Sequence, residues 1–135
     1  MIVETLLSIG NTLFTLRSAL SKARKERKQA VADFIASIAE SIEGASTELK
    51  QRQYPHGKCQ ELFAHSEHME AAIGDLVGKP DAQALGARLK QVWQIENLFG
   101  ELQGMPDDER LRKLAALDQA AGTFRATAAF VRASP

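Results

Sequence analysis

Residues 2–20, IVETLLSIGNTLFTLRSAL, contain the pattern that decides the fold class. Apolar side chains recur there at steps of three or four residues, which is the spacing along one face of an α-helix. They are Ile2, Leu6, Ile9, Leu13, Leu16 and Leu20. The pattern is interrupted by charge and resumes over residues 31–49. We therefore expect two helices, at about 2–21 and 26–52. One long helix stays open as an alternative, because no Gly or Pro lies between Asn11 and Glu43.

Three turns divide the rest of the chain. Each combines a Pro with a nearby Gly, the residues that start and end helices: Pro55 with Gly57, Pro80 with Gly78, and Pro106 with Gly104. The segments between them have helical apolar spacing and predict helices at about 57–77, 81–103 and 107–132. Short connections make successive helices antiparallel. The sequence thus predicts one domain over residues 1–135, an all-α, compact up-down helical bundle of four to five helices.

The predicted core of the later helices comes from their apolar stripes. The stripe of the third helix includes Cys59, Leu62, Phe63, Met69, Ile73 and Leu76. That of the fourth includes Leu85, Leu89, Val92, Trp93, Phe99 and Leu102. The stripe of the last helix includes Leu111, Leu114, Leu117, Ala121, Phe124, Ala128 and Val131.

Composition restricts the class of function. The chain has 17 basic and 17 acidic residues, and this balance argues against non-specific nucleic-acid binding, which needs a basic surplus. One cysteine, Cys59, suits a reducing compartment. No run of 18 apolar residues is present, and the basic cluster follows the first apolar stretch, unlike a secretory signal. We expect a cytoplasmic protein, with peripheral membrane association as an open possibility.

Few residues suggest catalysis or metal binding. Glu61, His65 and His68 share one side of the third helix, and His and Glu are competent metal ligands. That side is rotated away from the apolar stripe, and no other helix supplies a matching ligand pair, so we interpret it as a solvated flank. Cys59 is interpreted as a small buried hydrophobe rather than a reactive thiol. We expect no catalytic residue, no metal and no cofactor.

The first helix is the most unusual element. Between Ile2 and Leu20 only Glu4 and Arg17 are charged, and the polar positions are hydroxyl or amide side chains. Such groups are cheaper to desolvate than charges. A basic run, Lys22 to Lys28, follows directly. Three interpretations remain: a central strut of the bundle, a surface for a partner or for self-association, and a helix that enters an anionic membrane surface.

Our leading hypothesis from the sequence is a non-enzymatic interaction or adaptor module that self-associates or binds a protein partner. The alternative is a membrane-active bundle, because the layout is similar to that of helical-bundle cell-death domains, which also begin with an amphipathic helix. The candidate interaction residues are Leu6, Leu13, Phe14, Thr12, Thr15, Arg24, Lys25, Arg27 and Lys28.

Overall fold

The computed structural model describes residues 2–135, except the side chain of Trp93. Helices make up 88% of it, and the described residues contain no strand, which confirms the predicted all-α bundle. The elements are α1 (Ile2–Thr15), α2 (Arg17–Leu20), α3 (Lys25–Lys50), α4 (His56–Val77), α5 (Lys79–Leu89), the 3₁₀ helix η1 (Lys90–Gln94), α6 (Ile95–Gln103) and α7 (Asp107–Ala133).

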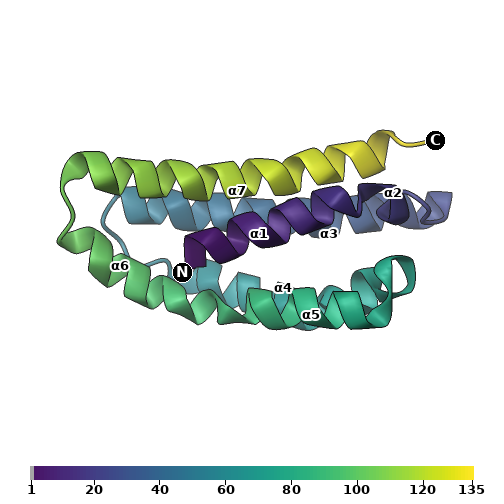
Figure 1. The fold of residues 1–135 in the computed structure, drawn as a ribbon, viewed down its shortest axis with the longest axis horizontal. Helices are drawn as coiled ribbons and strands as arrows, with labels where there is room; N and C mark the ends of the chain where they lie inside the picture. The colour runs from purple at the N-terminus through teal and green to yellow at the C-terminus, as the bar shows by residue number, and fades with distance from the viewer. Residues whose placement is uncertain (1) are drawn as a thin grey trace.

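The chain runs up and down along one long axis (Figure 1). α1 and α2 run in one direction, and α3 runs back in the opposite direction, so the first two predicted helices are separate. α4 reverses the direction again, and α5, η1 and α6 lead back to the start of α7. The closest packing joins α3 to α7, α4 to α5, and α1 to α7. α1 and α7 run parallel, side by side, on one side of the molecule.

α3 and α7 are antiparallel, and each binds the carboxyl end of the other through a buried cation. Arg110, in the first turns of α7, donates to the carbonyls of Leu49 and Lys50, where α3 ends. Lys28, near the start of α3, donates to the carbonyls of Ser134 and Pro135 beyond α7. The last carbonyls of a helix have no partner within it, so Arg110 satisfies acceptors at the end of α3, and Lys28 binds the segment that follows α7.

Ion pairs follow the seam between α3 and α7. Asp118 pairs with Lys50 at 2.7 Å, and Arg132 pairs with Asp33 at 2.9 Å. Between them the Arg125 guanidinium binds the Glu43 carboxylate, with Nε 2.9 Å from Oε2. This guanidinium holds the pKa of Glu43 below its usual value. These contacts fix the register of the two helices and determine which side of α7 remains outside.

The structure corrects several details of the predicted stripes. Leu111 and Phe63 are exposed, and Phe99 is only partly buried; the Trp93 side chain lies outside the described residues. The predicted helix 81–103 changes to 3₁₀ geometry at Lys90–Gln94. Its buried side chains there recur every three residues, which is the 3₁₀ period: Leu89, Val92, Ile95 and Leu98.

Two helical glycines provide a matched test of the close packing between α4 and α5. A Cβ added at Gly86 would lie 2.8 Å from the Ser66 carbonyl oxygen, whereas one at Gly100 meets nothing within 4 Å. We expect Gly86→Ala to destabilise the fold by about 1–3 kcal/mol through overpacking. Gly100→Ala should stabilise it by up to about 1 kcal/mol, because Ala is the better helix former. Urea unfolding measures both; a stabilising Gly86→Ala would contradict the close approach.

Candidate interaction surface

The outer sides of α1 and α7 form one continuous surface, which we call the α1–α7 face. Its exposed residues are Asn11, Phe14, Thr15 and Ser18 from the first helical segment, and Leu111, Ala115, Gln119, Gly122, Ala126, Ala129, Phe130 and Ala133 from α7. None of these residues is charged, and the charges on the face are few: Arg17 lies beside the Phe14 and Phe130 rings, and Glu4 and Arg112 are exposed near its ends. A solvated bundle helix normally carries charge on its outer side, so this face differs from the rest of the surface.

Large apolar side chains stand on this face. Phe14 is 38% exposed, Phe130 42% and Leu111 58%. The Arg17 guanidinium lies 4.2 Å from the centre of the Phe14 ring and 5.3 Å from that of Phe130. It also donates to the Phe14 carbonyl. This cation joins an aromatic ring of α1 to one of α7, which shows that the two outer sides are contiguous.

The threonines of α1 are already hydrogen-bonded within their own helix. Thr12 Oγ1 donates to the Ser8 carbonyl at 2.9 Å, and Thr15 Oγ1 donates to the Asn11 carbonyl at 3.0 Å. A partner that covers these hydroxyls therefore removes no donor from its acceptor. The desolvation cost is correspondingly small.

The other α1 candidates lie inside the bundle. Leu6 and Leu13 have no exposed surface, and Gly10 lets α1 approach α7 so closely that an added Cβ would lie 3.3 Å from the Phe124 ring. α1 is thus both a core element and an exposed one. Of the predicted α1 residues, the structure brings Phe14, Thr12 and Thr15 to the outside and keeps the two leucines in the core.

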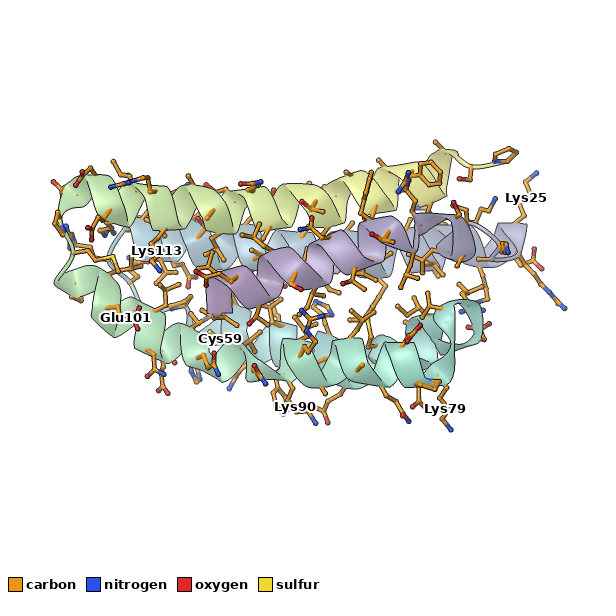
Figure 2. The ribbon with its side chains drawn as sticks, in the orientation of Figure 1. Lys25, Cys59, Lys79, Lys90, Glu101 and Lys113 are labelled. Atoms are coloured by element: carbon orange, nitrogen blue, oxygen red, sulfur yellow. The ribbon has the colours of Figure 1, made fainter. Side chains whose placement is uncertain are left out.

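The basic run is divided between internal contacts and solvent. Arg27 pairs with Asp75 and donates to the Ala72 carbonyl at 2.8 Å, and Lys28 is the buried cation at the end of α7. Arg24 and Lys25 are exposed. Lys25 projects away from the bundle where α3 begins (Figure 2). Two of the four predicted basic residues therefore hold the fold together, and two face solvent.

A second apolar region lies at the opposite end of the bundle. A cleft of about 460 Å³ is lined there by residues that include Tyr54, Cys59, Phe63 and Glu96. Tyr54 stacks edge-on against Phe99, with 5.5 Å between ring centres. Burial raises the pKa of the Cys59 thiol to about 11. The thiol is therefore protonated near neutral pH and is a poor nucleophile.

The His-containing flank of α4 is engaged in structural contacts. Glu61 accepts hydrogen bonds from Ser41 Oγ at 2.8 Å and from Lys58 Nζ at 3.2 Å. His65 lies edge-on to Phe34, with 5.8 Å between ring centres. Within residues 2–135 no group of three or more His, Cys, Asp or Glu side chains is arranged to hold a metal ion.

Comparisons with known proteins add no further information. The chain matches no protein-family model, no curated protein and no solved structure. In the described residues, no helix has the length and apolar character needed to cross a membrane. The functional inference therefore rests on the molecule itself.

The outer side of α7 was missed by the sequence analysis, which followed only its buried stripe. The available signal was a run of small, uncharged residues at alternating steps of four and three, from Ala115 through Gln119, Gly122 and Ala126 to Ala129. This run lies on the side opposite the buried Leu114, Leu117 and Phe124. It becomes informative only when that side is known to face solvent.

His65 makes stability depend on pH. Partial burial lowers its pKa below the ordinary value of 6.5; His68 adds to this effect and Glu61 opposes it. The unfolded chain consequently binds more protons between the two pKa values, and stability falls as the pH drops below 6.5. The urea midpoint of unfolding should decrease between about pH 7 and about pH 5 in the wild type. We expect this decrease to be smaller in His65→Gln and to be the same as in the wild type in His56→Gln. An unchanged slope in His65→Gln would contradict the assignment.

Proposed function

We propose that this chain is a non-enzymatic protein-interaction module, an adaptor that docks on its partner through the α1–α7 face. The observation that carries the proposal is the scarcity of charge along that face, where Arg17 and Arg112 are the cations, combined with the exposed Phe14, Phe130 and Leu111. Interface centres are depleted in charged side chains and enriched in aromatic ones. A partner would cover these groups at little desolvation cost.

The groups that an enzyme could use support the same proposal. Cys59 has a raised thiol pKa, and the Glu61 carboxylate is bound by Ser41 and Lys58. Neither is poised to attack or to transfer a proton. The lone cysteine also suits a reducing cytoplasm, where we place the protein.

A protein partner is favoured over nucleic acid by the distribution of the basic residues. Arg27 and Lys28 are used inside the molecule, and Arg125 and Arg132 pair with α3 carboxylates. The chain as a whole has equal numbers of basic and acidic residues, whereas binding to a phosphate backbone favours a basic surplus.

A charge placed on the face tests the function. We expect Ala126→Lys to keep the fold and lose association, because the lysine must be desolvated when a partner docks. Ala71→Lys is the matched control, since Ala71 is equally an exposed helical alanine but lies on α4. Tagged wild type and both variants are used to isolate partners, including untagged copies of the chain, and these are quantified by mass spectrometry. Equal recovery by wild type and Ala126→Lys would refute the docking face.

Membrane association is the second candidate, favoured by the exposed cations Lys22, Arg24 and Lys25. Because Arg27 and Lys28 hold the fold, only these three are changed to Gln. If the end of the bundle binds anionic vesicles, co-sedimentation should fall by roughly two orders of magnitude, since an anionic surface attracts each nearby cation by about 1 kcal/mol. High salt should have the same effect. Absence of vesicle binding by the wild type would remove this candidate.

A further inference from the structure

The α7 side of the face has a centre. Gly122 lies midway between Leu111 and Ala133, and Ala115 and Ala129 lie at equal distances on either side of it. A Cβ built at Gly122 meets nothing within 4 Å, so another backbone can approach closely at this point. Alternating four- and three-residue steps keep a single seam along the helix, as in paired helices.

The flank of α7 next to α3 is divided by charge at the same centre. Before Gly122 it carries Asp107 and Asp118, and after Gly122 it carries Arg125 and Arg132. Their ion pairs with α3 and Arg52 leave all four side chains between 42% and 90% exposed. Half of the flank is therefore acidic and the other half basic, and both halves remain accessible to a second molecule.

We propose that the partner on the α1–α7 face is a second copy of this chain, with α7 packed antiparallel to α7 across a two-fold axis at Gly122. Such an axis reverses the helix direction but keeps each flank against the same flank of the other copy. The acidic half thus meets the basic half, and Asp118 lies beside Arg125 of the second copy. In a parallel pair the axis runs along the helices and sets each charged flank against the opposite, α1-side flank of the other copy, so Asp118 and Arg125 lose this pairing. The proposal rests on the function proposed above.

The apolar groups fit the same axis. Leu111 lies opposite the small Ala133 of the second copy, and Phe130 lies opposite the stem of Arg112. Both α1 helices come to the other flank of the α7 pair. α7 alone offers about 40 Å of length and a helix width of about 10 Å, or roughly half of the about 800 Å² that a stable interface covers on each partner. The outer side of α1, with Phe14, supplies the remainder.

Cysteine cross-linking distinguishes the possible arrangements. In a Cys59→Ser background, Gly122→Cys places two thiols at the axis, where they can form a disulfide. Ala115→Cys and Ala129→Cys each lie about 20 Å from their own copies. We expect Gly122→Cys to cross-link with itself, and Ala115→Cys to cross-link only with Ala129→Cys when the two proteins are mixed. Ala71→Cys, on α4, gives the background from random collision.

Analytical sedimentation of the wild type gives its oligomeric state, which is combined with the cross-linking results to separate the possible outcomes. Self-cross-linking of Ala115→Cys and of Ala129→Cys, without the mixed product, would show a parallel pair and overturn the antiparallel arrangement while leaving the docking face intact. A monomeric wild type, with another protein captured and then lost in Ala126→Lys, would overturn the second copy but keep the proposed function. A monomer whose captured proteins are unaffected by Ala126→Lys would overturn both.

Discussion

The rest of the structure depends on the reciprocal bond between α3 and α7, in which each helix places a cation on the other's carboxyl end. Arg110 and Lys28 are 8% and 9% exposed, and a buried cation is costly unless its donors are satisfied. The acceptors of Arg110 are the last carbonyls of α3, which carry the negative end of the helix dipole. The acceptors of Lys28 are the carbonyl oxygens of the two residues that follow α7. Each contact thus gives a buried cation its acceptors and ties one helix to the end of the other.

This bond sets the register of the bundle and thereby selects its free surface. With the inner side of α7 held on α3, α1 packs along the adjoining side through Gly10 and Phe124. Within the described residues the remaining side of α7 faces solvent, and Arg112 is the charge among its outward positions from Leu111 to Ala133. The proposed docking face is therefore a consequence of how the two longest helices are joined.

Local patterns in the sequence predict the helices well, because apolar spacing and Pro–Gly turns are sufficient to place them. They do not predict what depends on partners distant in the chain. The positive charges of Arg27 and Lys28 suggested a free basic run, but Asp75 and the end of α7 lie far away in sequence. Leu111 follows the buried stripe by spacing and is nevertheless exposed, because the adjacent Arg110 takes the buried position at this level of α7 and binds the end of α3. Leu6 and Leu13 similarly belong to the core, whereas Phe14 reaches the surface.

The alanines on the exposed side of α7 can be explained by helix propensity alone, because alanine favours the helix in any environment. That explanation does not extend to Gly122, which weakens a helix, nor to three large apolar side chains left in water. Each of these half-exposed side chains forgoes part of the about 1.5–3 kcal/mol that full burial would provide. Within the described residues the bundle buries Phe124 and thirty-one other apolar residues completely or nearly so. Phe14, Phe130 and Leu111 are positioned instead on one surface with few charges, where the proposed second molecule would recover that free energy.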